Sequence, residues 1–268
     1  MLRKLFALSL TLIVLLAAGC GGGSGEKKAA AIKVGATAGP HAEVVEAAAK
    51  EAAKHGLKVQ VVEFSDYITP DKALADGEID LVSYQHQPFL ENFNKQNKTD
   101  LVPVGKAILM RMGIYSDKVH SVKDIPEGAL IAIPNDPTNG GRGLMLLERA
   151  GLLKLKEGVG IKATPKDIAE NPKKIEIREL EAAQLPRSLA DVDAAAITMN
   201  YVMSAGLDVK KQNIFLEPKD EPLAVMIIAA RKKDKDKPEY KDFVKAYQSE
   251  SVRKFIADKY KGTIEPAF

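Results

Sequence analysis

The sequence has no tryptophan, a single cysteine and almost no excess of charge. One cysteine excludes an intrachain disulfide bond. The 39 Lys and Arg against 36 Asp and Glu give a formal net charge of +3, and no basic stripe with interleaved aromatics occurs, which argues against nucleic-acid binding. The densest basic run, residues 231–237, contains two aspartates and is typical of a solvated turn.

Catalytic and metal-binding motifs are absent as well. The four histidines stand without metal-ligand spacing, and neither HExxH nor GxSxG is present. No internal repeat of fixed period is visible, which excludes a solenoid. We therefore predict a protein that is not an enzyme and that holds no cofactor or metal.

The single cysteine stands directly after a hydrophobic leader. Two basic residues precede an apolar run at 5–18, which has the length of a signal peptide and is too short to span a membrane. Small residues lead into Cys20, as in a bacterial lipobox, with the usual leucine (Leu16) one place early. We predict a lipoprotein signal peptide at 1–19 and a flexible tether at 20–31, with the protein lipid-anchored on the extracytoplasmic side of a cell membrane. The alternative is an ordinary secretory signal with a chance cysteine.

The remainder alternates between apolar β-type runs and amphipathic helical patterns. This alternation implies parallel strands joined by right-handed crossovers, with helices on both sheet faces. Two such series separated by long apolar stretches indicate a bilobed α/β fold, with lobe 1 from 32–114 plus 228–268, lobe 2 from 115–227, two hinge strands and a ligand cleft between the lobes. Predicted strands cover residues 32–35, 58–64, 79–84, 101–115, 130–133, 175–180, 194–198 and 223–230. Predicted helices cover residues 41–55, a short segment from 69, 88–97, 138 or 139 to 150, a short segment after 186, and 240–256.

The stretch 130–151 contains the first candidate for a binding site. Its apolar strand is stopped by residues 134–137 (PNDP), and Thr138 or Asn139 is expected to cap the next helix. Three glycines surround Arg142 in this segment. A Gly-rich turn that opens a helix presents backbone N–H groups to an anion, and Arg142 adds a planar fork for a carboxylate or phosphate. We expect Arg142→Ala to abolish ligand binding with little loss of stability; the alternative is a surface arginine in a tight connection.

Two further segments place aromatic side chains beside polar groups at predicted strand ends. They are Phe64-Ser65-Asp66-Tyr67 and Ser83-Tyr84-Gln85-His86. Each tyrosine alone is equally compatible with packing at the edge of a core. Together with Arg142 across a cleft, these segments predict a pocket for a small molecule with one carboxylate and one apolar arm.

Four sequence blocks resemble the NlpA/MetQ family of methionine-binding lipoproteins. They are FSDYITP at 64–70, YQHQPFL at 84–90, PNDPTNGGR at 134–142 and ELEAAQLPRSL at 179–189, in the family's order. The resemblance covers essentially the whole mature chain and implies a periplasmic-binding-protein-like (type II-like) fold. It further implies a monomeric substrate receptor of an ABC importer, with a permease and an ATPase as partners, that closes its lobes on methionine or a related amino acid or dipeptide.

The resemblance also implies roles for individual residues. The arginine of the third block, Arg142, would hold the ligand carboxylate. Tyr67, Tyr84 and His86 would wall the pocket for the ligand side chain. The two asparagines that complete the predicted site are Asn139 and Asn200.

Three positions depart from the family pattern. Thr198 and Val225 stand where family members have asparagines that help to hold the amino-acid head group, and Arg111 replaces a proline. Removing a polar partner from a buried ligand group costs ~1–3 kcal/mol, so we expect free methionine to bind more weakly here. Two alternatives remain open: a receptor of the same fold for a different small carboxylate, and a surface lipoprotein that acts in adhesion or protein interaction.

We predict that Cys20→Ala leaves folding intact but releases the protein from membranes, because the polar tether has no apolar face of its own to bind lipid. Membrane fractionation followed by immunodetection measures this distribution. A variant that stays in the membrane pellet would show that a second anchor exists.

Overall fold

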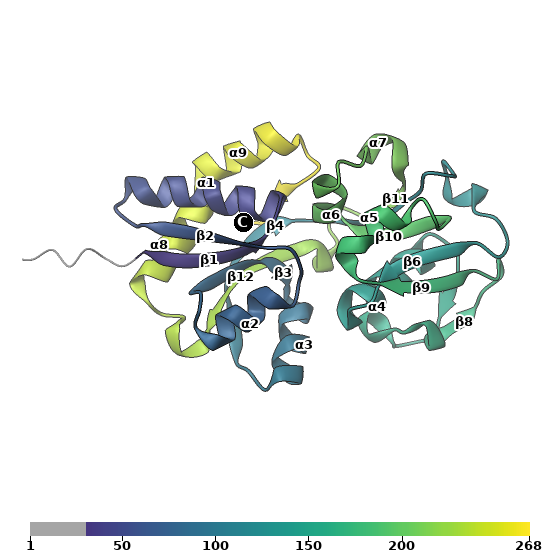
Figure 1. Cartoon of the computed structure of the whole chain (residues 1–268), viewed down its shortest axis with the longest axis horizontal. Helices are drawn as coiled ribbons and strands as arrows, with labels where there is room; N and C mark the ends of the chain where they lie inside the picture. Colours follow the sequence, from purple (N-terminus) through teal and green to yellow (C-terminus); the bar gives the residue numbers. More distant parts are fainter. Residues whose placement is uncertain (1–30) are drawn as a thin grey trace, which may run out of the picture.

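The computed structural model describes residues 31–268, so the predicted signal peptide, Cys20 and nearly all of the tether lie outside the described residues. Figure 1 shows two groups of helices and strands side by side, each built on its own sheet. The bilobed α/β fold that the sequence predicts is therefore confirmed. We call the part on the six-stranded sheet lobe 1 and the part on the five-stranded sheet lobe 2. No helix within residues 31–268 is long and apolar enough to cross a membrane.

Lobe 1 has a mixed sheet in the order β13-β4-β12-β3-β1-β2. The pairs of β1 with β2 and with β3 are parallel, whereas β12 runs antiparallel to both of its neighbours. The strands are β1 (Ile32–Thr37), β2 (Val59–Phe64), β3 (Leu81–His86), β4 (Leu101–Leu109), β12 (Val225–Arg231) and β13 (Glu265–Pro266). The helices are α1 (Pro40–Lys54), α2 (Thr69–Asp76), α3 (Gln87–Asn97), α8 (Pro238–Tyr247) and α9 (Glu250–Tyr260), with the short 3-10 helix η6 (Lys232–Asp234).

Lobe 2 has a sheet in the order β11-β5-β10-β6-β9. Its strands β10, β6 and β9 are parallel, and β5 runs antiparallel to β10 and β11. The strands are β5 (Met112–Tyr115), β6 (Leu130–Pro134), β9 (Glu176–Leu180), β10 (Ala194–Thr198) and β11 (Asn213–Leu216), with a separate hairpin of β7 (Lys154–Leu155) and β8 (Ile168–Glu170). The helices are α4 (Pro137–Arg149), α5 (Leu185–Ser188), α6 (Met199–Ser204) and α7 (Val209–Gln212), with the 3-10 helices η1 (Val122–Asp124), η2 (Gly160–Lys162), η3 (Pro165–Asp167), η4 (Ala182–Gln184) and η5 (Pro222–Ala224).

The chain crosses between the lobes twice, and the two crossings lie side by side. It leaves lobe 1 after β4 and returns directly before β12, and Met110 N donates a hydrogen bond to Ala224 O at 2.7 Å between the two crossings. The change of sheet therefore falls between β4 and β5 and between β11 and β12. Both changes come slightly earlier in the chain than the predicted boundaries after residues 114 and 227.

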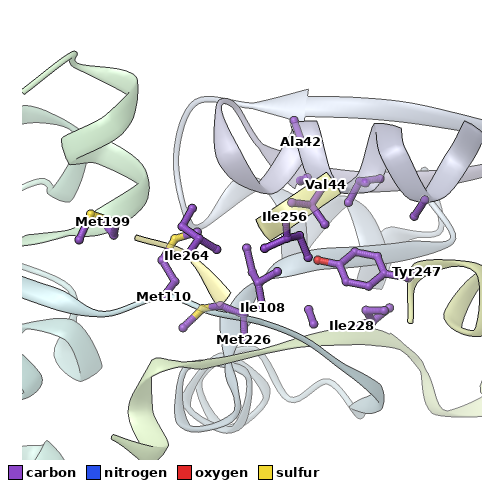
Figure 2. Close-up of a cluster of buried hydrophobic side chains, with 14 of the residues drawn as sticks. Ala42, Val44, Ile108, Met110, Met199, Met226, Ile228, Tyr247, Ile256 and Ile264 are labelled. Carbon is purple, nitrogen blue, oxygen red and sulfur yellow. The ribbon is translucent and has the colours of Figure 1, made fainter. Parts of the chain in front are cut away.

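One hydrophobic core continues across this junction. Figure 2 shows Met110 and Met226, which flank the crossings, lying between Ile108 of lobe 1 and Met199 of lobe 2. All four side chains are buried. Because methionine is flexible and fills irregular gaps, this packing suits a junction between two lobes.

The segment around Arg142 differs from the predicted Gly-rich turn, because its glycines lie inside helix α4. The N-cap is Asp136, whose Oδ1 accepts from Asn139 N at 2.9 Å, so neither Thr138 nor Asn139 is the cap. Pro137 occupies the first helical position, where its missing N–H costs nothing. The glycines instead permit close packing, since a Cβ on Gly141 would lie 2.0 Å from Ile161 O.

The predicted C-terminal helix is two helices. A break at Gln248 and Ser249 separates α8 from α9. Ser249 begins the second helix, because its Oγ accepts from Val252 N at 3.4 Å. One apolar stripe continues through both helices, and for this reason the sequence pattern predicted a single helix.

We predict that Gly141→Ala lowers the free energy of unfolding by ~1–3 kcal/mol, because the added methyl group overlaps the Ile161 carbonyl. Gly143→Ala is the matched control in the same helix: its Cβ would meet Ala196 and Ile133 at 3.4 Å, and alanine improves helix propensity by up to ~1 kcal/mol. Urea denaturation of both variants gives the comparison. Equal losses of stability would contradict the close approach of α4 to η2.

Candidate functional site

The carboxyl ends of five parallel strands meet between the lobes. His41 follows β1, Tyr67 follows β2, His86 ends β3, Arg142 follows β6 and Thr198 ends β10. Ligands of open α/β sheets bind beyond such strand ends. The structure has a small cavity here, lined by His41, Tyr67, Tyr84, Gln85, His86, Phe89, Met110, Asn139, Arg142, Thr198, Asn200 and Met226.

Seven of the nine predicted ligand-binding residues line this cavity, and two do not. Arg111 and Val225 are absent from its wall, which at these places is formed by their chain neighbours, Met110 of the first crossing and Met226 of β12. The sequence interpretation missed His41, although it follows the end of β1 closely, as Tyr67 follows the end of β2. Gln85 and Phe89 were also missed as lining residues, although both lie within the segment YQHQPFL at 84–90.

Arg142 is held by a buried carboxylate that the sequence interpretation did not identify. Its Nε donates to Glu217 Oε1 at 2.7 Å and its Nη2 to Glu217 Oε2 at 2.6 Å. Nη2 also donates to Met110 O at 3.1 Å. Only 2% of the Arg142 side chain and 3% of the Glu217 side chain are exposed. Removing one partner of a buried ion pair typically costs ~3–5 kcal/mol, so the expectation that Arg142 contributes little to stability is wrong.

Tyr67 joins the lobes through its hydroxyl group. The hydroxyl donates to Asn200 Oδ1 at 2.5 Å and lies 2.8 Å from Thr198 Oγ1. Since its one proton goes to Asn200, Thr198 is the donor in the second bond. Tyr201 of lobe 2 adds a third contact, donating to Ser65 O at 3.2 Å. Both lobes therefore touch directly at the cavity.

His86 makes a second connection between the lobes. Its Nδ1 accepts from Phe89 N at 3.2 Å, which places the ring proton on Nε2. Nε2 then donates to Asn139 Oδ1 at 3.1 Å, and Asn139 Nδ2 donates to Asp136. Burial, helped by the charge of Arg142, lowers the pKa of His86 to about 3. The ring is therefore neutral at pH 7.

Four polar atoms around the cavity remain available to a ligand. Asn200 Nδ2, His41 Nδ1 and Gln85 Oε1 are buried and have no hydrogen-bond partner within residues 31–268. The fourth atom is Arg142 Nη1, the guanidinium nitrogen that does not bond to Glu217 or Met110. The wall from lobe 2 thus offers two N–H donors suited to a carboxylate, whereas the Gln85 oxygen of lobe 1 is an acceptor.

Aromatic rings form the apolar part of the wall. Tyr67 and Tyr84 stack with ring centroids 6.0 Å apart, and Phe89 meets both rings edge-on at 6.1 Å. Tyr201 packs on the outer side of Tyr67 at 4.9 Å. Met110 and Met226 complete this surface, which suits an unbranched apolar or thioether group.

The chemistry of the site is that of binding. Within residues 31–268 no three His, Cys, Asp or Glu side chains form a group that could hold a metal ion. The lining residues include no cysteine, serine or carboxylate, and the hydroxyl of Thr198 and the Nε2 of His86 are bonded to Tyr67 and Asn139. The wall provides a cation and N–H donors from lobe 2, and aromatic and thioether side chains around the rest of the cavity.

Behind the aromatic wall lies Asp71 of α2, a buried acid. Its Oδ1 accepts from Gln85 Nε2 at 2.6 Å, and its Oδ2 has no partner within the described residues. Burial raises the pKa of Asp71 to about 7, against the lowering effect of the bond from Gln85. The carboxyl group is therefore held near its point of ionisation at neutral pH.

Comparisons with known proteins place both lobes in one family. The family described as NlpA lipoprotein matches residues 32–268. The D-methionine-binding lipoprotein MetQ of Salmonella typhimurium is 46% identical over 253 residues, which cover 93% of this chain and 92% of the relative. The probable D-methionine-binding lipoprotein MetQ of Vibrio cholerae is 43% identical over 262 residues, with 97% and 96% covered. The structure of a nutrient binding protein from Burkholderia cenocepacia bound to methionine matches with a TM-score of 0.86 at 48% identity, covering 88% of this chain and 100% of that one.

We predict that Asp71→Asn stabilises the protein at pH 8 relative to wild type but changes little at pH 4. The folded-state pKa lies above the unfolded value of 3.8, so the folded state binds the extra proton between these values and loses stability as the pH rises through them. Asparagine cannot ionise, so the difference in unfolding free energy should grow from pH 4 to pH 8 by on the order of 1–3 kcal/mol.

The control for this change is Asp76→Asn, which removes an exposed acid from the same helix. Urea denaturation of wild type and both variants at several pH values measures the differences. If the unfolding free energies of Asp71→Asn and wild type differ by the same amount at every pH, Asp71 is ionised over the whole range.

Proposed function

This chain belongs to the NlpA lipoprotein family, and we propose that it is the substrate-binding lipoprotein of an ABC importer, which captures methionine or a closely related amino acid or dipeptide between its lobes. The resemblance indicated by the four sequence blocks is confirmed by relatives that are 43–46% identical over most of the chain. The family is one of binding proteins, so the chain is not an enzyme.

One observation carries this proposal: a single wall holds free N–H donors beside an apolar surface. Arg142 Nη1 and Asn200 Nδ2, both from lobe 2, are suited to a ligand carboxylate. The aromatic rings of lobe 1 and the two methionines lie around the rest of the same cavity. A methionine molecule has a carboxylate at one end and a thioether at the other, and sulfur contacts aromatic rings favourably.

Closure of the lobes uses residues of the cavity itself. Tyr67 and His86 of lobe 1 bond to Thr198, Asn200 and Asn139 of lobe 2. A ligand that contacts these residues therefore favours the closed arrangement over the open one. In this proposal a permease recognises the closed form, an ATPase drives transport, and the receptor acts as a monomer.

The three positions that depart from the family pattern should affect methionine binding less than the sequence suggests. Val225 and Arg111 lie outside the wall of the cavity, so a change at either position does not by itself remove a ligand contact. Thr198 does line the cavity, but its hydroxyl bonds to Tyr67. Weaker binding of methionine than in relatives remains a prediction that rests on Thr198.

Anchoring completes the proposed role. Lipidation of Cys20 would hold the receptor at the outer face of a membrane, where the tether at 20–31 spans at most ~40 Å when extended. The receptor then works within reach of a membrane-embedded permease. This arrangement rests on the lipobox and on the lipoprotein names of the relatives.

We predict that L-methionine or D-methionine stabilises the wild-type protein in a thermal-shift screen of amino acids, dipeptides and organic acids. A ligand at 100 times its Kd stabilises by ~2.7 kcal/mol, which such a screen detects readily. Calorimetry on Asn200→Ala should then show roughly ten- to hundredfold weaker binding, because a donor to the ligand and the bond to Tyr67 are both lost.

The control is Asn97→Ala, an exposed asparagine at the end of α3, which should bind like wild type. A screen in which no amino acid or dipeptide shifts the melting temperature would contradict the proposal and favour the adhesion or interaction role. Unchanged affinity in Asn200→Ala would move the carboxylate site away from lobe 2.

A further inference from the structure

The wall of the cavity carries one formal charge. Arg142 is the only Lys, Arg, Asp or Glu among its lining residues. The two lining histidines are neutral at pH 7, because burial lowers the pKa of His41 and of His86 to about 3. Alone, the charge of Arg142 would make the cavity a site for a simple anion.

Glu217 cancels that charge without lining the cavity. It follows β11, and its backbone N donates to Met112 O at 3.0 Å. Its Oε2 accepts from Met112 N at 2.6 Å, and both oxygens accept from Arg142. Three donors thus fix a carboxylate directly behind the guanidinium group.

Neighbouring charged groups do not change this balance. Arg111 donates from Nη1 to the backbone O of Glu217 at 3.4 Å, but its side chain is half-buried and lies outside the wall, so it offers no charge to the ligand directly. Asp136 accepts from Asn139 and Thr138 at the N-terminus of α4, where the helix amides offset a negative charge.

We propose that Glu217 is a positioning residue that makes this site select ligands whose own charges cancel and reject ligands of net negative charge. This inference rests on the proposed function and names the residue that determines which net charge a ligand of the site can carry. With Arg142 and Glu217 together neutral, a zwitterion leaves the closed cavity neutral. A monoanion with the same apolar arm leaves one negative charge buried without a counterion, which is costly.

The same contacts set how the ligand carboxylate is held. Glu217 accepts from Nε and Nη2 of Arg142, and Met110 O accepts the second hydrogen of Nη2, so only Nη1 is left for a ligand. A bidentate grip on the ligand by the guanidinium fork is thereby prevented. A carboxylate bound at Nη1 can take a further bond from Asn200 Nδ2, a donor of the same wall that has no partner within the described residues.

The experiment compares two ligands that differ only in the ammonium group: L-methionine and its desamino analogue, methylthiobutanoate. Isothermal calorimetry on the wild type should show methionine binding tighter by about a hundredfold or more. In Glu217→Gln the ratio of the two affinities should fall at least tenfold, because Arg142 then presents an uncompensated charge that favours the anion.

Glu221→Gln is the matched control. Glu221 is also buried and also paired with an arginine, Arg149, but that arginine does not line the cavity. The same substitution there should leave the affinity ratio at its wild-type value. A second variant, Glu217→Asp, keeps the negative charge and should keep the preference for methionine even if absolute affinities fall.

Several results would overturn the inference. If Glu217→Gln weakens both ligands by the same factor, Glu217 is only structural. If Glu217→Gln does not fold, the wild type and Glu217→Asp still decide, because equal binding of the two ligands to the wild type rejects charge selection. Failure of methionine to bind the wild type would overturn the proposed function as well, whereas tight methionine binding without preference overturns this inference alone.

Discussion

A guanidinium group can be removed from water only where acceptors replace the water, and this requirement shapes lobe 2. Arg142 extends from α4, and Glu217 reaches it from the segment after β11. Glu217 also bonds to the first residue of β5, so the ion pair links three parts of the lobe that are distant in sequence. Because the pair is almost fully buried, neither member can be lost without leaving an unpaired charge. The cation of the cavity and the fold of lobe 2 therefore depend on the same two bonds.

Around this pair, recognition and closure share the same atoms. Tyr67 and His86 both line the cavity and bond across the cleft. Tyr67 follows β2 and His86 ends β3, two strands of the mixed lobe 1 sheet, and the carboxyl ends of both face those of the parallel strands β6 and β10 in lobe 2. The glycines of α4 serve this arrangement from behind, since Gly141 allows the helix to pack against Ile161. The position of Arg142 thus results from close packing at one side of its helix and an ion pair at the other.

The sequence predicted well those features that leave a local pattern. Strand β10 was predicted with its observed bounds, and Tyr67, Tyr84 and His86 were placed in the site because each lies at or just after the end of a recognisable strand. The sequence failed where the cause is tertiary. Glycines near Arg142 were interpreted as a turn because their real role, contact with Ile161, is made by a distant loop. Glu217 was missed because nothing near it in sequence marks a partner 75 residues away. Val225 was placed one residue from the position whose side chain, Met226, lines the cavity.

The order of the strands has a consequence for how the chain acquires its fold. Lobe 2 is one uninterrupted stretch, whereas β12, which lies between β4 and β3 in the lobe 1 sheet, follows lobe 2 in the chain. As the chain is extended from its N-terminus, lobe 2 can complete its sheet while β3 and β4 still have open edges, and such edges invite aggregation. A folded lobe 2 holds its two ends together at Met110 and Ala224. It thereby delivers β12 to the gap between β4 and β3, so that the inserted lobe acts as a template for the lobe that encloses it.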